Sequence, residues 1–522
     1  MDAGRLRPLL PRRDALALLL AAGFALPYAV PSLSRFRALR AEDLARPVRS
    51  LSGRPSVPLL VFTDPEPSEP QSPATPPAEP AASVLSPAAP AAPAEPPRIP
   101  LSRLGEPSGG EVEDPTGELD RFFERLEAVR RGSGVVRISH FGDSPLTGDL
   151  ISGEARARLQ AAFGSAGHGF VLAGRPWGWY GHRGLSIASS GWRFLSPLFS
   201  SGNGGHCGLA GVAFAASAPS ARTVLRLEKE AFTRLQVSFL VRPGGGTFVV
   251  SVDDGRPEEV STAGLERATG SFDREVPPAR SLALWPKGDG EVVLYGAVLE
   301  RDGPGVVYDA LGANGASVHF LSLLDAAGWE SALSLRGSDL VVVGLGTNES
   351  GYAGIPGPRY EREYAEVIGR VRRALPLASV LLMAPMDRGT RGETGEVVTM
   401  PSIPRIVEAQ RRVARANGCA FFDTFAAMGG EGTMGRWFAT EPRLVTGDFT
   451  HTTKTGSDRV ARVFVGALTR AYLSWRGEQA PPAPGSPAPA PPSPASAPDG
   501  QQGGAPAEPG AERPEDQKAP GR

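Results

Sequence analysis

Cysteine is nearly absent from this 522-residue sequence, which contains only Cys207 and Cys419. Two cysteines do not make the disulfide framework of a small secreted domain, and by themselves they do not make a metal site. We expect two buried thiols, although the sequence also allows a single bridge between them. Four histidines show no metal-ligand spacing and are expected to be structural or on the surface: His168, His182, His206 and His319. We therefore expect no metal and no cofactor.

An excess of positive charge is also missing. The chain has 55 basic and 56 acidic residues and a net charge of −1. A protein that binds nucleic acid needs basic side chains to neutralise phosphates. The balance therefore argues against nucleic acid as a partner, and nothing in the sequence indicates an oligomer, so we expect a monomer.

Aromatic residues are almost absent from two proline-rich tracts, Pro55 to Pro107 and Pro481 to the C-terminus, and neither tract shows hydrophobic periodicity. Segments rich in Pro, Ala, Ser and Glu cannot bury enough apolar surface to offset the entropy of the chain. We expect a disordered spacer before the folded part and a disordered tail after it.

Long apolar runs are scarce, and the one at the N-terminus is short. An apolar run over residues 15–30 follows four arginines, Arg5, Arg7, Arg12 and Arg13. Pro27 interrupts this run near its end, and Pro31 follows it. The run falls short of the ~20 residues of an ideal membrane-spanning helix. It fits an anchor in the cytoplasmic membrane or a cleaved signal, and we favour the anchor because no small-x-small cleavage site is evident. Either interpretation predicts a folded part in the periplasm or cell envelope, tethered or secreted.

Between the proline-rich tracts, apolar strands alternate with amphipathic helices. We expect strands over residues 135–141, 306–311, 339–345, 379–384 and 419–423. The helices are expected over residues 118–131, 149–163, 360–375, 403–417 and 454–475. Strands that alternate with helices indicate a parallel sheet covered on both faces.

A different pattern interrupts this alternation between residues 196 and 301. Short β-like runs follow one another there, separated by turn signals such as Pro243-Gly244-Gly245-Gly246 and Asp254-Gly255. This spacing predicts a small antiparallel β-sandwich inserted into the α/β part.

The first strand ends in the tetrapeptide Gly142-Asp143-Ser144-Pro145. A serine between a strand and a helix is where an α/β protein presents a nucleophile. The same residues also suit a simple helix start, since Ser is a good N-cap and Pro favours the first helical position. The tetrapeptide alone does not decide between these interpretations.

Later residues favour the nucleophile. Asp448 and His451 lie three apart before the last helix, a spacing that lets a carboxylate meet one imidazole nitrogen. Gly315 and Asn348 follow two other strands, and the carboxyl ends of parallel strands meet at one edge of the sheet.

In order, Gly142-Asp143-Ser144, Gly315, Gly346-x-Asn348 and Asp448-x-x-His451 resemble the four blocks of the SGNH (GDSL-type) hydrolase superfamily. The resemblance implies a flavodoxin-like α/β/α fold and ester hydrolysis. It makes Ser144 the nucleophile, His451 the base and Asp448 its orienter. The oxyanion hole would use the backbone N–H of Ser144, the backbone N–H of Gly315 and the amide of Asn348. Pro145 is compatible, because in this arrangement the serine's own N–H is the donor and the next residue needs none.

Further motifs around these four blocks resemble those of envelope peptidoglycan O-acetylesterases, which carry a carbohydrate-binding-like sandwich inside the catalytic domain. These motifs are His140-Phe141 before the first block, Gly167-x-Gly169-Phe170, Ser189-Ser190-Gly191-Trp192, Gly312-x-Asn314-Gly315-Ala316 and Asp423-x-x-x-x-Met428-Gly429-Gly430. Four aromatic residues, which fit either stacking on sugar or packing between domains, lie between these blocks or within them: Trp177, Trp179, Tyr180 and Trp192.

The sequence thus predicts six segments: an anchor or signal (1–35), a spacer (36–115), a first hydrolase segment (116–195), the inserted sandwich (196–303), a second hydrolase segment (304–476) and a tail (477–522). The predicted function is an exported serine ester hydrolase that removes O-acetyl groups from peptidoglycan or another O-acylated envelope glycan. Two alternatives stay open: a polysaccharide O-acetyltransferase with the same triad, and a non-catalytic glycan-binding envelope protein.

Overall fold

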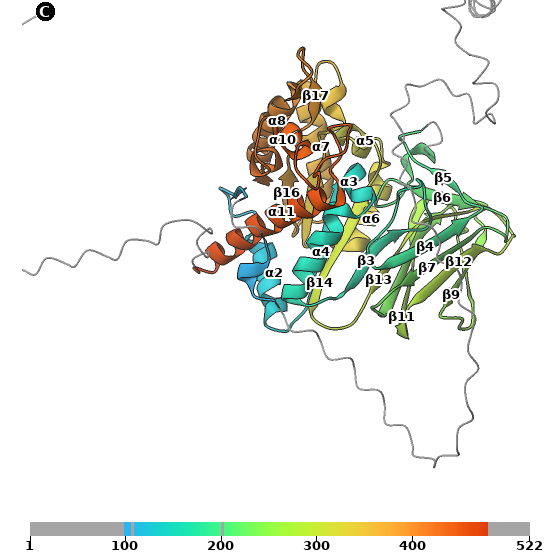
Figure 1. Cartoon of the computed structure of the whole chain (residues 1–522). Coiled ribbons are helices and arrows are strands. Elements are labelled where there is room, and N and C mark those ends of the chain that lie inside the picture. The colour runs from blue at the N-terminus through green and yellow to red at the C-terminus, as the bar shows by residue number, and fades with distance from the viewer. Residues whose placement is uncertain (1–98, 106–108, 200–202, 479–522) are drawn as a thin grey trace, which may run out of the picture. The chain divides into compact units, whose positions relative to one another are not determined.

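The computed structural model of the chain describes residues 99–105, 109–199 and 203–478 (Figure 1). The expected anchor or signal, most of the spacer and nearly all of the tail lie outside these ranges. Within them, no helix combines the length and apolar character needed to cross a membrane.

A six-stranded sheet forms the centre of the hydrolase domain. Its strands, in spatial order, are β1 (Val112–Glu113), β19 (Ala420–Phe422), β16 (Ser379–Met383), β15 (Leu340–Gly344), β2 (Val135–Gly142) and β14 (Gly305–Gly312). All neighbours pair in parallel except β1, which adds an antiparallel edge to β19. From β14, the parallel strands follow the chain order 2-1-3-4-5, which is the flavodoxin-like arrangement. The predicted fold class is confirmed.

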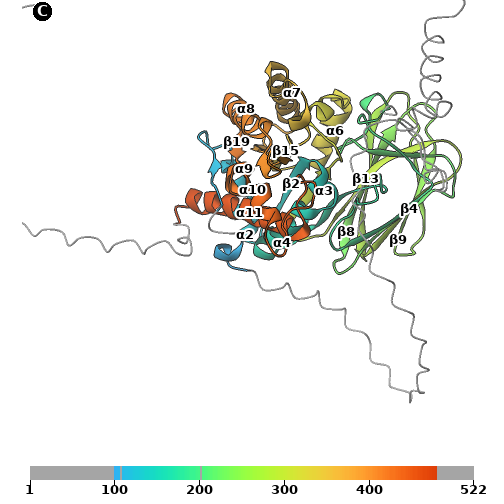
Figure 2. The same cartoon turned by 45° about the horizontal axis from the view of Figure 1, so that its top comes forward.

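Helices cover both faces of this sheet because alternate residues of each strand point to opposite sides. In β15, Val341 and Val343 join one apolar cluster, and Leu340 and Val342 join the other. The first cluster includes residues of α5 (Val318–Ser322), α6 (Ala326–Arg336), α7 (Pro358–Ala374) and α8 (Ser402–Ala416). The second includes residues of α2 (Asp120–Arg130), α3 (Ser144–Thr147), α4 (Leu150–Phe163), α10 (Thr433–Phe438) and α11 (Lys454–Trp475). Figure 2 shows these two helical layers on either side of the sheet; the short α9 (Thr424–Ala427) follows β19.

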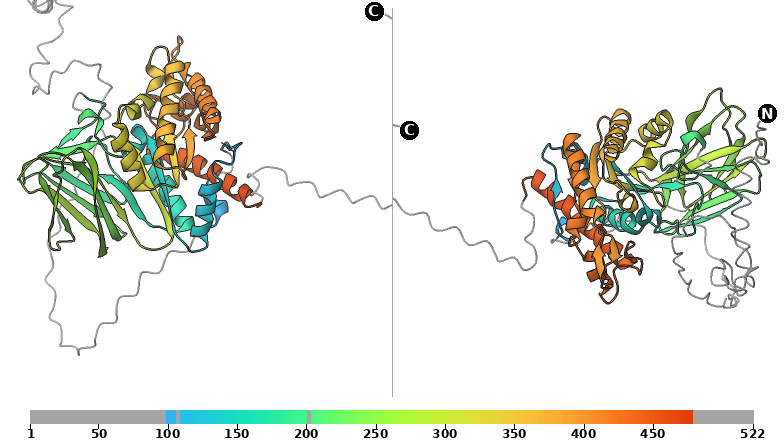
Figure 3. Two further views of the ribbon diagram at one scale, coloured as in Figure 1. Left: turned by 180° about the vertical axis from the view of Figure 1, so that it is seen from behind. Right: turned by 90° about the horizontal axis from the view of Figure 1, so that it is seen from above.

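Two antiparallel sheets make the sandwich, whose strands are drawn mostly in green in Figure 3. One sheet contains, in order, β10 (Glu258–Ser261), β9 (Thr247–Val252), β12 (Ser281–Pro286), β7 (Arg222–Leu227) and β4 (Leu185–Ser190). The other contains β11 (Ala268–Ala279), β8 (Phe232–Val241), β13 (Val292–Glu300), β6 (Ala213–Ala216) and β5 (Arg193–Leu195), with β3 (Gly167–Leu172) also paired to β13.

The sandwich is inserted between β2 and β14, which are neighbours in the central sheet. It is packed firmly onto the hydrolase domain. One apolar cluster runs without a break from the α6–α8 face of the central sheet into the sandwich interior. The indole N–H of Trp329 on α6 also donates to the carbonyl of Leu209, at 3.0 Å.

The sandwich begins earlier than the sequence predicts. Strands β3, β4 and β5 lie in the range 116–195, which the sequence assigns to the hydrolase, yet all three pair into a sandwich sheet. The sequence pattern gives no strand signal at β4, because this strand is short, polar and exposed at every second residue. It also gives no signal for β11, an edge strand that is mostly solvent-exposed and contains Pro277 and Pro278, or for a two-stranded hairpin of β17 (Gly389–Arg391) and β18 (Val397–Thr399).

Candidate active site

Ser144 lies at the carboxyl edge of the central sheet. β2 ends at Gly142, Asp143 stands at the N-cap position without a capping side-chain hydrogen bond, and Ser144 is the first residue of the one-turn helix α3. That helix lies directly on β14, because a Cβ placed on Gly312 would come within 2.4 Å of the Thr147 nitrogen. The backbone N–H of Ser144 is one of the helix-start donors that have no partner within the helix.

The structure brings Ser144, His451 and Asp448 together. The Ser144 hydroxyl lies 2.9 Å from Nε2 of His451, although the two residues are 307 positions apart in the chain. Nδ1 of the same ring lies 2.6 Å from Oδ2 of Asp448. The three side chains thus form one hydrogen-bonded series in which the hydroxyl can pass its proton to the imidazole.

The Asp448 carboxylate is held in its ionised form. Its Oδ1 accepts from the Thr446 hydroxyl at 2.7 Å and from the backbone N–H groups of Thr450 and His451 at 3.0 Å. Burial alone would raise the pKa of Asp448, but these bonds and the one from His451 lower it below the ordinary value. In turn, the hydrogen bond to Asp448 raises the pKa of His451.

Gly315 and Asn348 lie on the loops that follow β14 and β15 at the same edge. Gly315 is exposed, has a φ of +79°, and a Cβ there would meet nothing within 4 Å. The amide nitrogen of Asn348 donates to the carbonyl of Ala316 at 2.8 Å and lies 3.4 Å from Oδ2 of Asp143. Asn348 therefore joins the β14 loop to the residue that precedes Ser144.

Three ionisable residues that the sequence did not assign to the site surround it. Asp143 is 5% exposed, and burial raises its pKa to about 6. Glu349 is buried beside Asn348, and burial raises its pKa to about 7. Arg388 donates to the carbonyl of Thr347 and the hydroxyl of Ser350, both at 2.9 Å. The sequence held only a weak signal for them, since each follows or adjoins a strand end.

The loop that carries Asp448 and His451 is anchored through a strained residue. Phe449 has a φ of +54°, which is unusual for a bulky side chain. Its ring is buried and packs on the ring of Phe438, with the two ring centroids 5.0 Å apart. Its carbonyl accepts a hydrogen bond from the N–H of Gly389 in β17 at 2.7 Å. The β17–β18 hairpin therefore holds this loop in its conformation.

Other buried ionisable residues and both cysteines have structural surroundings. His140 is buried, lies 2.8 Å from the Tyr308 hydroxyl, and has its pKa lowered to about 3 by burial. Asp149 accepts from Ser152 and pairs with Arg156 in the core. Cys207 and Cys419 are both buried. Across the described ranges, no group of three or more His, Cys, Asp or Glu side chains is placed to hold a metal ion.

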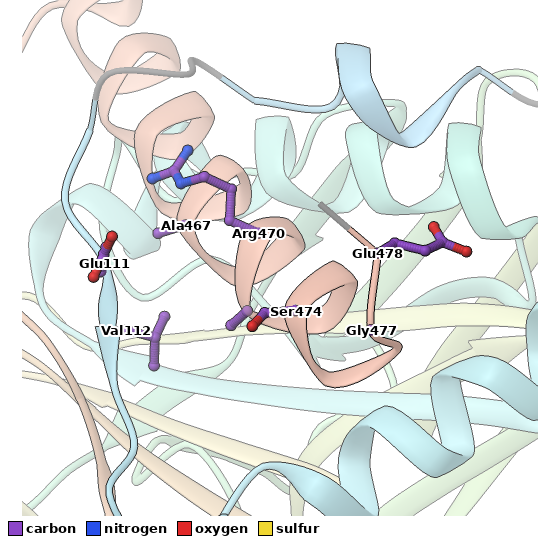
Figure 4. Close-up of a pocket in the computed structure, with 8 residues that line it drawn as sticks. Glu111, Val112, Ala467, Arg470, Ser474, Gly477 and Glu478 are labelled. Carbon is purple, nitrogen blue, oxygen red and sulfur yellow. The ribbon is translucent and has the colours of Figure 1, made fainter. Parts of the chain in front are cut away.

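A cavity of about 700 Å³ lies away from this site, against the C-terminal turns of α11 (Figure 4). Its lining includes Ala467, Arg470 and Ser474, whereas His451 precedes the other end of the same helix. The helical rise puts its lining residues on α11 about 20 to 30 Å from that end. It takes no part in the chemistry of Ser144.

Comparisons with known proteins agree with this fold. The GDSL-like lipase/acylhydrolase family matches residues 283–459, a range that contains Gly315, Asn348, Asp448 and His451 but not Ser144. A solved structure described as "Peptidoglycan O-acetylesterase in action, 5 min" has 23% sequence identity and a TM-score of 0.60, over 70% of this chain and 99% of that chain. A family two carbohydrate esterase from Cellvibrio japonicus is 12% identical with a TM-score of 0.22, over 56% of this chain and 99% of that chain. A search of curated proteins finds no match.

The family match over residues 283–459 and the fold shared with the O-acetylesterase structure both support the resemblance to SGNH (GDSL-type) hydrolases that the sequence blocks indicate.

Proposed function

We propose that this chain is an exported serine esterase that removes O-acetyl groups from peptidoglycan or another envelope polysaccharide. The observation that carries the proposal is the hydrogen-bonded series of Ser144, His451 and Asp448 at the carboxyl edge of the sheet. The structural likeness to a peptidoglycan O-acetylesterase supports the choice of substrate class. The basic and apolar N-terminal segment, residues 1–35, supports export and a tether to the cytoplasmic membrane.

The mechanism begins when Ser144 attacks the acetyl carbonyl and His451 takes the hydroxyl proton. Asp448 keeps Nδ1 of His451 protonated and stabilises the imidazolium that forms. His451 then protonates the departing sugar oxygen, leaving an acetyl-serine. Water, deprotonated by the same histidine, releases acetate and restores the hydroxyl.

The negative oxygen of each tetrahedral intermediate is bound by the N–H groups of Ser144 and Gly315 and the Asn348 amide. The Asn348 amide donates to Ala316 at 2.8 Å, and its second hydrogen bond, to Asp143, is long at 3.4 Å, so the substrate oxygen can replace Asp143 as its acceptor. Each donor contributes on the order of 3 kcal/mol to lowering the barrier.

The test is acetate release from O-acetylated peptidoglycan and from O-acetylated soluble polysaccharides. Wild type should release acetate, and Ser144→Ala should lose activity by about 10⁴-fold or more. Ser186→Ala, at an exposed serine on β4, is the matched control and should behave as wild type. Equal release by wild type and Ser144→Ala would disprove the serine mechanism. Adding an acceptor glycan distinguishes hydrolysis from acetyl transfer.

A further inference from the structure

Four aromatic residues form what we call the aromatic strip: Trp179, Trp177, Phe194 and Phe199. The structure separates them from the other aromatic residues of this region, because Tyr180 is buried and its hydroxyl accepts from the N–H of Leu172 at 2.9 Å. By contrast, Trp179 is 46% exposed and Phe199 is 41% exposed. Trp177 and Phe194 are partly buried against the sandwich core.

The strip begins beside the nucleophile. The N–H of Gly181 donates to the carbonyl of Thr147 at 3.3 Å, so the turn that carries Trp179 lies against α3. Thr147 and Ser144 are the two ends of that one-turn helix, which separates them by about 4.5 Å along its axis. The backbone of the turn that carries the exposed Trp179 therefore lies about one helical turn from the backbone of Ser144.

The strip continues onto the sandwich. Trp177 precedes Trp179 in the same turn, which the N–H of Tyr180 closes on the Trp177 carbonyl at 3.1 Å. The ring centroids of Trp177 and Phe194 are 6.4 Å apart, and those of Phe194 and Phe199 are 5.6 Å apart. Phe194 belongs to β5, so the rings lead from the hydrolase domain to the inserted sheet.

The turn is also rigid. The guanidinium of Arg175 donates to the carbonyl of Gly178 at 2.5 Å, and the Arg175 N–H donates to the Ser189 hydroxyl at 3.0 Å. Tyr180 lies 3.0 Å from a buried histidine, His182, and anchors the other side of the turn. A fixed aromatic ring loses little conformational entropy when a ligand stacks on it.

We infer that the aromatic strip is a binding site for the glycan chain of the substrate, extending from Ser144 along β5. This inference rests on the proposed function and names the part of the protein that holds the polymer. Aromatic faces bind the apolar C–H faces of sugar rings while the sugar hydroxyls stay in water. Continuity with the catalytic serine favours a polysaccharide, because the chain that carries the ester must continue past the site.

The inference predicts different effects along the strip. With O-acetylated glycan strands of peptidoglycan sorted by length, Trp179→Ala should raise KM by about tenfold for short and long strands. Phe199→Ala should raise KM for long strands only, and neither variant should change kcat by more than about twofold. Trp179→Phe should restore most of the affinity. Leu265→Ala, at a 96% exposed residue of the sandwich, is the control.

An unchanged KM for long strands in folded Trp179→Ala and Phe199→Ala would overturn the inference while leaving the esterase intact. A change of oligomeric state in Trp179→Ala, measured by sedimentation velocity, would also overturn it, because the strip would then contact a second copy. If wild type releases no acetate from any glycan, the proposed function fails instead. Cosedimentation with the same strands then tests the aromatic strip separately, by comparing the Ser144→Ala variant with the double variant Ser144→Ala/Trp179→Ala. Weaker binding by the double variant supports the inference, and equal binding overturns it.

Discussion

At the scale of single residues, the Asp448 carboxylate accepts four hydrogen bonds, two of them from His451. The negative charge raises the pKa of His451, and the imidazole must be neutral to take the proton of Ser144. The activity should therefore rise with pH as His451 loses its proton.

Asp448→Asn should change both the rate and its pH dependence. Loss of the charge lowers the pKa of His451, so the acidic limb of the pH profile should move to lower pH. The variant should also lose about 10³-fold or more in kcat, because the imidazolium is no longer stabilised. The measurement is kcat/KM against pH with an aryl acetate. Asp254→Asn, at an exposed turn position, is the control, and an unmoved acidic limb would contradict the role given to Asp448.

Glu349 should make the stability of the protein depend on pH. Its Oε1 accepts from the N–H of Val318 at 2.8 Å, and its Oε2 has no hydrogen-bond partner among the described residues. Burial raises its pKa from 4.5 to about 7, so the folded state prefers the neutral acid. The stability this provides is present below pH 4.5 and is lost as the pH rises through 7.

Glu349→Gln should therefore gain stability relative to wild type as the pH rises from about 5 to about 8, by on the order of 2–3 kcal/mol. Denaturant unfolding at several pH values measures the difference. Glu275→Gln, at an exposed site on β11, controls for the removal of one charge. A difference that does not depend on pH would show that the buried carboxyl does not titrate in this range.

At the scale of elements, the β17–β18 hairpin fixes the loop that carries Asp448 and His451. A Cβ on Gly389 would come within 2.7 Å of the Val397 side chain and 2.9 Å of the Phe449 side chain. Gly389→Ala should therefore displace the loop and lower kcat/KM by about tenfold or more. Gly392→Ala, in the same hairpin, meets only the flexible end of Glu396 and should keep wild-type activity. Equal activity of both variants with an aryl acetate would contradict this role of the hairpin.

The elements also show what could be predicted from the sequence. The central strands and the helices beside them were predictable, because strands buried on both faces are continuous apolar runs, as in Leu340–Gly344. Strands β4 and β11 were not, since they are largely exposed and mix polar residues with proline or glycine. The positions of Ser144, Asp448 and His451 were predicted from spacing and resemblance. The anchoring of their loop by Gly389 was not, because it depends on a contact between distant segments.

At the scale of the whole molecule, the hydrolase domain and the sandwich share one apolar cluster. Two bodies with a common core should lose their structure together. We expect a single thermal transition for residues 99–478, with near-UV circular dichroism, calorimetry and loss of esterase activity giving the same midpoint. Two separated transitions would show that the sandwich unfolds independently.

The position of β2 has a consequence for how the protein is made. This strand pairs with β14 on one side and β15 on the other, and both are synthesised after the whole sandwich. His451, the hydrogen-bond partner of Ser144, lies 307 residues further along the chain and is synthesised later still. Contacts between such distant segments form slowly, since loop closure must precede them. The series of Ser144, His451 and Asp448 is therefore incomplete until the segment that carries His451 has joined the fold, so the proposed activity depends on folding of the whole hydrolase domain.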